Sequence, residues 1–292
     1  ITQLLRRENN EITVRLHNVE ESSRWYPGAG LYRPVRLIFT GDIRIDPWET
    51  FFRTLSADAN NANVSVNTQI KGAKSTKNIK TTVTIKNADG RVVAQKTASP
   101  DAQGRASFNL DVAHPQLWSP ESPTLYTLIT TVKDGNKHLD RTSQRVGIRT
   151  IDVSRAHGFR LNGLSRKFQG VCLHHDLGPL GAAVNKSAII RQIRLMKDMG
   201  VDAIRTSHNM PSQMQMEVCD SMGMMVMAES FDAWAEPKVK NDYNRFYTQW
   251  WRKDLTNLIK GHRNHPSIVM WSIGNEIPEQ WKTEGARRAK EM

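Results

Sequence analysis

Residues 201–229 read VDAIRTSHNMPSQMQMEVCDSMGMMVMAE, and this stretch decides the fold. It contains two short, mostly apolar runs, Val201–Arg205 and Met224–Ala228, which have the length expected of buried strands. The segment between them, Pro211–Met222, has the apolar spacing of a helix, with proline in its first turn and Gly223 directly after its end. A strand, a helix and a second strand in this order predict two parallel strands joined by a crossover helix.

The same alternation continues in both directions along the chain. Before the quoted stretch come a predicted strand at Phe168–Leu173 and a predicted helix at Lys186–Met199, with Asn185 as its N-cap. After the stretch come a predicted helix at Phe246–Lys260 and a strand at Ile268–Ile273. Four strands that alternate with helices predict a parallel sheet covered by helices.

Polar side chains follow the ends of these four strands. The carboxyl ends of parallel strands meet at one edge of a sheet, and (β/α)8 barrels build their active sites there. Structural residues would be spread over both ends, so the sequence predicts a functional site at this edge. The candidate residues at this edge are His174, Asp176, Arg205, His208, Glu229, Asn275 and Glu276.

Residues 49–150 have the pattern of an antiparallel β-domain instead. Val64–Ile70 and Thr81–Ile85 alternate apolar and polar residues, and Asn87–Gly90 is a hairpin signal. Short strands at regular spacing with turns between them predict an immunoglobulin-like sandwich.

Residues 1–48 form a third part of the chain, before the sandwich. Ile12–Leu16 and Val35–Phe39 both alternate, which predicts strands. We interpret this part as the end of another β-domain. The predicted domain order is therefore 1–48, 49–150 and 151–292, the last being the strand–helix domain.

Composition and charge exclude several classes of protein. The chain is 38% hydrophobic and 24% charged, which is ordinary for a folded protein and not for a disordered one. The net charge is +12, but the basic residues are scattered and no nucleic-acid recognition motif accompanies them, so a nucleic-acid partner is not predicted. Apolar runs such as Met222–Ala228 are far too short to span a bilayer, so a membrane partner is not predicted either.

Glu276 is the first candidate for chemistry. It follows Trp271 and Ile273 at the end of a buried strand, and apolar neighbours are expected to raise the pKa of a carboxyl group. Such a carboxyl can protonate the leaving oxygen of a glycoside, and in retaining enzymes a second carboxylate lies roughly 5–5.5 Å away. Asn275 is placed to bind a sugar 2-hydroxyl. The alternative is that Asn275 and Glu276 only begin a helix.

The other candidates each have two interpretations. Arg205 can orient a site carboxylate or form a structural salt bridge, and Glu229 can be a site carboxylate or the partner of Arg205. Trp234 can stack on a sugar or pack in the core. His262 and His265 precede the fourth strand, at the opposite end of the sheet, and we assign them structural roles.

The run His174-His175-Asp176 suggests a metal site at first. No further ligand falls at a metal-motif spacing, and consecutive side chains on an extended segment point to opposite faces. At most two of the three then face one cavity, and we favour His174 and Asp176 as groups that bind sugar hydroxyls. A zinc-dependent hydrolase that uses His174 and His175 is the alternative.

Five stretches, taken together and in order, resemble glycoside hydrolase family 2. The resemblance covers nearly the whole chain, and it is more specific than any one motif. The stretches are Trp25–Arg33, Leu117–Tyr126, Gly170–Asp176, Arg205–His208, and Arg263–Ile268 with Trp271–Glu276.

The resemblance implies a fold and a set of roles. Residues 1–48 correspond to the C-terminal part of a jelly-roll sugar-binding domain, 49–150 to an immunoglobulin-like sandwich, and 151–292 to the first half of a TIM barrel. It implies that Glu276 is the general acid/base and that Asn275 contacts the 2-hydroxyl. His208 and His174 would bind the sugar or stabilise the transition state, and Asp176 would match a substrate-contacting acid.

The resemblance also implies an activity, that of a retaining β-glycosidase of the β-galactosidase type acting on a β-linked oligosaccharide or glycoside. A β-glucuronidase or β-mannosidase of the same family, or a non-catalytic carbohydrate-binding fragment, are the alternatives. No cofactor is expected: Ala233 and Ala235 stand near positions where some members bind magnesium, so the sequence supports neither structural magnesium nor sodium.

The resemblance ends part-way through the barrel. Four of eight strand–helix units are present, so we expect the nucleophile beyond Met292 and expect this polypeptide alone to be inactive. An open sheet edge and exposed apolar surface predict contact with further segments or self-association as a homo-oligomer. The compartment is unknown from the residues; the resemblance suggests the bacterial periplasm or the outside of the cell.

Overall fold

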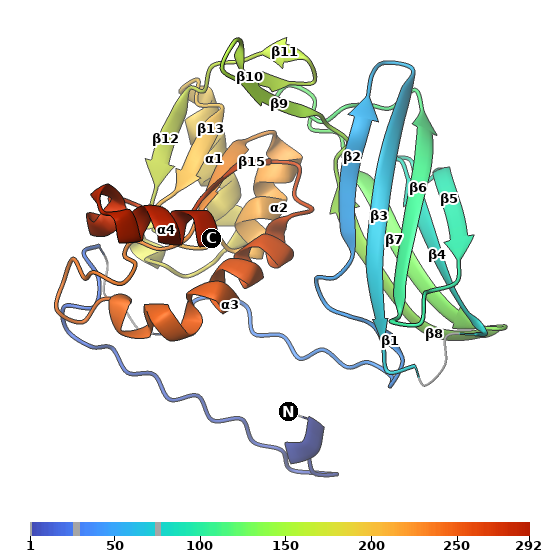
Figure 1. Ribbon diagram of the computed structural model, residues 1–292, viewed down its shortest axis with the longest axis horizontal. Coiled ribbons are helices and arrows are strands. Elements are labelled where there is room, and N and C mark those ends of the chain that lie inside the picture. The colour runs from blue at the N-terminus through green and yellow to red at the C-terminus, as the bar shows by residue number, and fades with distance from the viewer. Residues whose placement is uncertain (1, 26–29, 74–76) are drawn as a thin grey trace.

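The computed structural model describes residues 2–25, 30–73 and 77–292, and it contains a β-sandwich beside a helix-covered parallel sheet (Figure 1). In the first sheet of the sandwich β3 pairs antiparallel with β1, β2 and β6, and the second sheet has the order β5-β4-β7-β8. The strands are β1 (Arg44–Ile45), β2 (Phe51–Ala57), β3 (Asn61–Lys71), β4 (Ile79–Lys86), β5 (Val92–Ala98), β6 (Arg105–Ala113), β7 (Tyr126–Asp134) and β8 (Lys137–Val146).

Apolar side chains from both sheets fill the space between them. Burial alternates along β6, because every second residue of a strand faces the same side. Val64 and Phe108 from the first sheet and Val83 and Leu128 from the second belong to one buried cluster. The sandwich predicted from alternation is thus the observed architecture of this part.

A small antiparallel sheet joins the sandwich to the strand–helix part, and it was not predicted. Its order is β11-β10-β9, and in Figure 1 it lies above the parallel sheet and beside the upper end of the sandwich. Its strands are β9 (Ile151–Ser154), β10 (Gly158–Leu161) and β11 (Leu164–Ser165).

The strand–helix part is a parallel sheet in sequence order, β12-β13-β14-β15, as the alternation predicted. This is the arrangement of the first strands of a (β/α)8 barrel. The strands are β12 (Gly170–Leu173), β13 (Ala203–Thr206), β14 (Met225–Glu229) and β15 (Ile268–Ser272). The α-helices are α1 (Lys186–Asp198), α2 (Gln213–Met222), α3 (Asn244–His262) and α4 (Thr283–Glu291), and the 3-10 helices are η1 (Thr2–Leu4), η2 (Gly178–Leu180) and η3 (Pro278–Trp281).

The ends of the helices follow from single residues. The Asn185 side chain accepts a hydrogen bond from Ala188 N, which confirms the predicted N-cap of α1. The prediction that Pro211 lies in the first turn of α2 is wrong, because the Ser212 side chain caps the helix and the first turn begins at Gln213. Within the described part of the chain, none of these helices has the length and apolarity needed to cross a membrane.

The prediction of strands in residues 1–48 is wrong for both segments. Ile12–Leu16 and Val35–Phe39 have no strand structure, and side chains such as Ile12 and Phe39 are exposed. An alternating segment becomes a strand only when another strand pairs with it, and none of the described residues pairs with either segment. Among residues 2–25 and 30–48, only β1 is a strand, and it pairs with the sandwich. Residues 26–29 of the predicted jelly-roll motif lie outside the described residues.

The sandwich is fixed to the base of the parallel sheet, which is the end opposite the candidate site. The Trp118 indole Nε1 donates to Asp220 O (2.8 Å), and Arg149 Nη2 donates to Ile268 O (2.6 Å). Burial lowers the pKa of Arg149 to about 10. The Asn264 side chain accepts from Phe52 N (2.9 Å) and donates to Thr50 O (2.7 Å) and to Gln144 Oε1 (2.9 Å). These contacts hold the start of β15, and therefore the strand that leads to Glu276.

Candidate active site

Glu229, the last residue of β14, organises the carboxyl end of the sheet. Its side chain is fully buried, and its Oε2 accepts from Arg205 Nε (2.7 Å) and from Ser272 Oγ (2.6 Å). Its Oε1 pairs with His208 Nδ1 (2.7 Å). Of the two interpretations made for Glu229 and Arg205, the structure shows an internal ion pair. Because a carboxylate only accepts, His208 donates through Nδ1, and Nε2 of the neutral ring is an acceptor.

Asn275 is fixed from both sides. Its Oδ1 accepts from Arg205 Nη2 (2.9 Å), and its Nδ2 donates to Asp232 Oδ1 (2.9 Å). The amide therefore has one orientation, and each of its polar atoms keeps capacity for one further hydrogen bond. Asn275 is buried, so its position relative to β14 is determined by these contacts.

Asp232 carries a second ion cluster beside Asn275. Arg24 donates to it through Nη2 (2.9 Å) and Nε (3.2 Å), and Lys238 Nζ donates to its Oδ1 (2.9 Å). Partial burial by itself raises the pKa of Asp232, but the hydrogen bonds from Arg24, Asn275 and Lys238 outweigh it and hold that pKa far below its ordinary value. Asp232 is therefore ionised at neutral pH.

Glu276 lies at the outer edge of this arrangement. Its side chain is 69% exposed, and Oε2 accepts from Arg24 Nη2 (3.1 Å). Its φ of 44° is in the left-handed region, which non-glycine residues adopt rarely and most often at functional sites. The prediction of a raised pKa is wrong. The hydrogen bond from Arg24 and the charges of Arg24 and Lys238 lower the pKa of Glu276, and they outweigh desolvation and the charge of Asp232, which raise it.

The residues connected by these hydrogen bonds at the carboxyl end of the sheet are together called the mouth network. It joins the ends of three strands to a segment near the start of the chain. The mouth network consists of Arg24, Arg205, His208, Glu229, Asp232, Lys238, Asn275 and Glu276.

Sequence reasoning missed three members of the mouth network. Asp232 lies three residues after the end of β14, so the rule used for Glu229 applies to it as well. Lys238 follows in the same loop. Arg24 could not be found from spacing, because 252 residues separate it from Glu276.

His174 and His208 lie together with Trp25 from the N-terminal segment. The Trp25 ring stacks on His174 with centroids 3.9 Å apart, and His174 and His208 meet edge to face at 5.1 Å. Burial, then the neighbouring histidines His208 and His175, lower the pKa of His174. His174 is therefore uncharged at neutral pH.

These rings line a cleft of about 480 Å³, which we call the mouth cleft. Its size is within the range of small-ligand sites, roughly 300–1,000 Å³. Asp232 and Ser230 line it on the β14 side, and Trp25 lines it on the side of the N-terminal segment. Glu276 is not part of the lining; it is connected to the cleft through Arg24 and Asp232.

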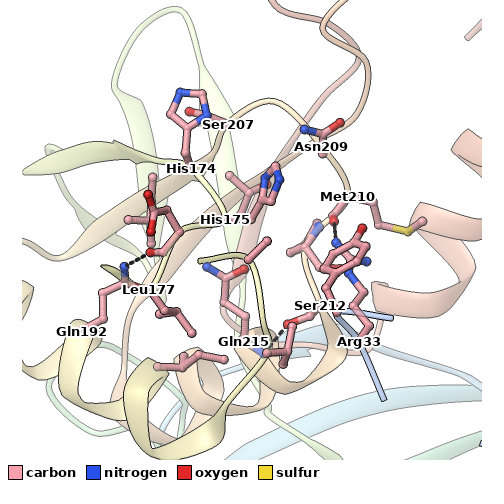
Figure 2. A pocket seen from close by; sticks show the side chains of 18 residues that line it. Arg33, His174, His175, Leu177, Gln192, Ser207, Asn209, Met210, Ser212 and Gln215 are labelled. Carbon is pink, nitrogen blue, oxygen red and sulfur yellow. Dashed lines mark hydrogen bonds between the residues drawn. The ribbon is translucent and has the colours of Figure 1, made fainter. Parts of the chain in front are cut away.

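A smaller cavity of about 40 Å³ lies next to the mouth cleft, between the loops after β12 and β13. Figure 2 shows His174 and Ser207 on one side of it, Met210 and Arg33 on the other, and His175 between them. His174, His175 and Asp176 all line this cavity, so the prediction that His175 faces away is wrong. The segment is not extended: Asp176 N donates to His174 O (2.9 Å), and this tight turn abolishes the alternation.

Asp176 lies outside the mouth network. Its Oδ1 accepts from Gly178 N (2.7 Å) in its own loop, and it does not line the mouth cleft. Asp176 thus shares the smaller cavity with His174 but does not line the mouth cleft, and its hydrogen bond to Gly178 shapes the loop after β12.

Trp234 is a core residue, which corrects the prediction that it binds substrate. It is 4% exposed, and its ring stacks with Tyr247 at 6.4 Å. Its Nε1 donates to Ile273 O (2.8 Å), so the polar tip is also used internally. No broad face of the indole is free for a sugar.

The histidines at the base have structural contacts, as expected. His265 Nδ1 pairs with Asp220 Oδ2 (2.5 Å), and its Nε2 pairs with Gln213 Oε1 (3.0 Å). His262 is 2% exposed, and burial lowers its pKa to about 3. In residues 2–25, 30–73 and 77–292, no three His, Cys, Asp or Glu side chains are arranged to hold a metal ion. The zinc-hydrolase alternative therefore has no third ligand in that part of the chain.

Comparison with known proteins assigns the chain to a family. The model of the glycosyl hydrolases family 2 TIM barrel domain matches residues 152–290, and a second model, that of glycosyl hydrolases family 2, matches residues 43–149. This chain belongs to glycosyl hydrolase family 2. Its fold is the family's sandwich domain followed by part of its barrel domain.

Relatives of this family 2 chain have two activities in their names. The β-galactosidase BoGH2A of Bacteroides ovatus is 43% identical over 280 residues, a match that covers 94% of this chain and 33% of the relative. A β-glucuronidase of Bacteroides fragilis is 26% identical, with 93% of this chain and 42% of the relative covered.

A family 2 crystal structure from Bacteroides cellulosilyticus has the same fold. It superposes with a TM-score of 0.87 at 35% identity, over 92% of this chain and 36% of that one. The family 2 chain thus spans between 33% and 42% of the length of these relatives.

Proposed function

We propose that the mouth network is the acid/base side of the active site of a retaining β-glycosidase, with Glu276 as general acid/base. One observation carries this proposal: an exposed carboxyl group stands at the carboxyl end of the barrel sheet, directly after an asparagine whose amide is fixed from both sides. Barrel enzymes place reacting groups at this end. The match to family 2 supports the same assignment.

The contacts of Glu276 suggest how its carboxyl group becomes protonated before it acts as an acid. An acid catalyst donates its proton to the leaving oxygen, and a neutral carboxyl is required for that step. Arg24 stabilises the ionised form of Glu276, so we infer that Arg24 leaves Glu276 when a glycoside binds. Arg24 still has Asp232 as a partner after this change. Asn275 and His208 would hold sugar hydroxyls beside the scissile bond.

We propose a β-linked galactoside as substrate. The relative with 43% identity is named a β-galactosidase, and the B. fragilis relative named a β-glucuronidase keeps that activity as the alternative. The second carboxylate would come from a later barrel strand, and we expect the 292-residue chain alone to be inactive. All activity tests therefore use the chain within a protein that supplies the remaining barrel strands, which we call the complete-barrel protein.

The test replaces Glu276 by glutamine in the complete-barrel protein. Without general-acid help, turnover of glycosides with poor leaving groups is expected to fall by about 10²–10⁴-fold. Activated nitrophenyl glycosides need little protonation, so their cleavage is expected to fall much less. The measurement is kcat/KM for an alkyl and a nitrophenyl β-galactoside.

A matched control is Glu284→Gln, which removes an exposed carboxylate that pairs with Arg287 on α4. It is expected to leave both rates unchanged. Equal losses on both substrates in Glu276→Gln would show that Glu276 is not the proton donor. We expect catalysis to require the second carboxylate from a later barrel strand. Turnover of a nitrophenyl β-glycoside by the 292-residue chain alone would contradict this expectation.

A further inference from the structure

We propose that Asp232, Ser230 and His208 form a hydroxyl-reading wall of the sugar site, and that this wall selects an uncharged sugar against a uronic acid. This inference rests on the proposed function, because it names the substrate class of the same site. All three residues line the mouth cleft.

The two carboxylate oxygens of Asp232 accept different numbers of hydrogen bonds. Its Oδ1 accepts from Arg24 Nη2, Lys238 Nζ and Asn275 Nδ2, whereas Oδ2 accepts, among the residues that the structure describes, only from Arg24 Nε at 3.2 Å. A carboxylate oxygen accepts about two hydrogen bonds, so Oδ2 keeps room for another donor. The side chain is 23% exposed, so a ligand in the cleft can reach it.

Ser230 and His208 add two further unused groups. Ser230 is 5% exposed, and its hydroxyl finds no partner among the described residues. A buried polar atom without a partner costs free energy, which a bound hydroxyl would recover. His208 uses Nδ1 for Glu229, and across the described ranges its Nε2 takes part in no hydrogen bond. In the neutral ring this nitrogen is an acceptor.

The cations near the wall already donate hydrogen bonds to groups of the protein. Lys238 is 8% exposed, and its Nζ donates to Asp232 and to Asn275 O. Arg24 donates to Asp232 and Glu276. Arg33 lines the cleft; its Nη1 and Nη2 donate to the carbonyls of Pro211 and Met210, and its buried Nε has no partner among the described residues.

The free capacity of the wall therefore favours acceptors. Sugar hydroxyls donate to acceptors, whereas a uronate carboxylate is itself only an acceptor and carries the same charge as Asp232. A site built to bind a hydroxyl rejects a substrate that cannot supply the donor, because its own polar groups are then left unpaired. The wall thus fits a neutral hexose such as galactose.

The experiment compares two substrates on three forms of the complete-barrel protein. The substrates are nitrophenyl β-galactoside and nitrophenyl β-glucuronide, and the forms are wild type, Asp232→Asn and Glu236→Gln. Asparagine keeps the shape of Asp232 and an acceptor for Asn275 but removes the charge. Glu236 is the matched control, because it lies in the same loop and pairs with the exposed Lys282 outside the mouth network.

We expect the wild type to prefer the galactoside by about 100-fold or more in kcat/KM. Asp232→Asn is expected to lower the galactoside rate by about 10–100-fold and the glucuronide rate by much less, so that the preference shrinks at least about tenfold. Glu236→Gln is expected to keep both values within about twofold. Thermal unfolding of each variant checks that the fold is retained.

Two results would overturn the inference: wild-type preference for the glucuronide, or an unchanged substrate ratio in Asp232→Asn. Failure of the proposed function is a different result, namely cleavage that does not depend on Glu276. In that case calorimetric binding of methyl β-galactoside and methyl β-glucuronide still tests whether the wall selects the uncharged sugar. Tighter binding of the galactoside that is lost in Asp232→Asn supports it, and equal binding of both glycosides contradicts it.

Discussion

The two ends of the parallel sheet use the same kinds of residue in different ways. At the base, His265 has a partner at each ring nitrogen, and the Asn264 amide makes three hydrogen bonds to the sandwich. At the mouth, His208 has a hydrogen-bond partner only at Nδ1 in the described part of the chain, and Glu276 is 69% exposed. Asp232 likewise keeps one oxygen with a single contact.

This difference separates stability from function. A polar group that is fully satisfied inside the protein stabilises one structure and has nothing left for a ligand. A group held by one atom and free at another is both positioned and available. On this basis the satisfied groups at the base, and the buried Glu229 at the mouth, stabilise the fold, and we infer that the mouth groups with a free atom bind a ligand. Changes to satisfied groups are therefore expected to alter stability, and changes to groups with a free atom are expected to alter activity.

The largest effect on the fold is expected from Glu229→Gln. Glu229 is fully buried and neutralises Arg205, so removal of its charge leaves a partly buried guanidinium without its anion. We expect the free energy of unfolding of the 292-residue chain to fall by about 3 kcal/mol. Urea denaturation measures this value. The control is Glu217→Gln on the exposed face of α2, and an equal change in both variants would contradict the role of Glu229.

A smaller effect is expected at the base from Asn264→Ala. This change removes the three side-chain hydrogen bonds to Phe52 N, Thr50 O and Gln144, so we expect a loss of about 2 kcal/mol in the free energy of unfolding. The control is Asn109→Ala, an exposed position on β6. In the complete-barrel protein KM is expected to stay within about twofold, since no mouth residue is touched. A large rise in KM would show that the two ends are coupled.

The fold could be predicted wherever a local pattern decides it. Asn185 caps α1, and helix α3 and strand β15 lie where the apolar spacing places them, because burial of one face determines the period. Val35–Phe39 has an equally clear alternation but no partner strand, so the same pattern gave a wrong prediction. Local pattern identifies a candidate strand, and pairing decides whether it forms.

For the site, the sequence predicted which residues follow each strand, but not the contacts between residues from different strands. The rule for strand ends found Glu229, Asn275 and Glu276, but not what each contacts. The pKa of Glu276 was predicted in the wrong direction because its nearest charge, Arg24, comes from the other end of the chain. Hydrophobic neighbours in sequence say little about the electrostatics of a side chain that points away from them.

The smallest expected effect is a shift in pH dependence from Arg24→Met in the complete-barrel protein. Arg24 lowers the pKa of Glu276 and so favours the ionised carboxylate, whereas catalysis as an acid requires the protonated form. Without Arg24 the pKa of Glu276 rises toward its ordinary value, and the basic limb of the kcat/KM profile is expected to move to higher pH. The control is Arg252→Met, which breaks an exposed ion pair between Arg252 on α3 and Glu291 on α4. This variant is expected to leave the profile unchanged.

The salt dependence of this shift distinguishes charge from shape. Glu276 is exposed, so added salt screens its interaction with Arg24. The wild-type profile at high ionic strength is therefore expected to approach that of Arg24→Met, while the profile of the variant itself hardly responds to salt. A basic limb that moves to lower pH in Arg24→Met, or that ignores salt in the wild type, would mean that Arg24 supports the site by packing and that the Arg24–Glu276 contact does not set the proton affinity of the acid.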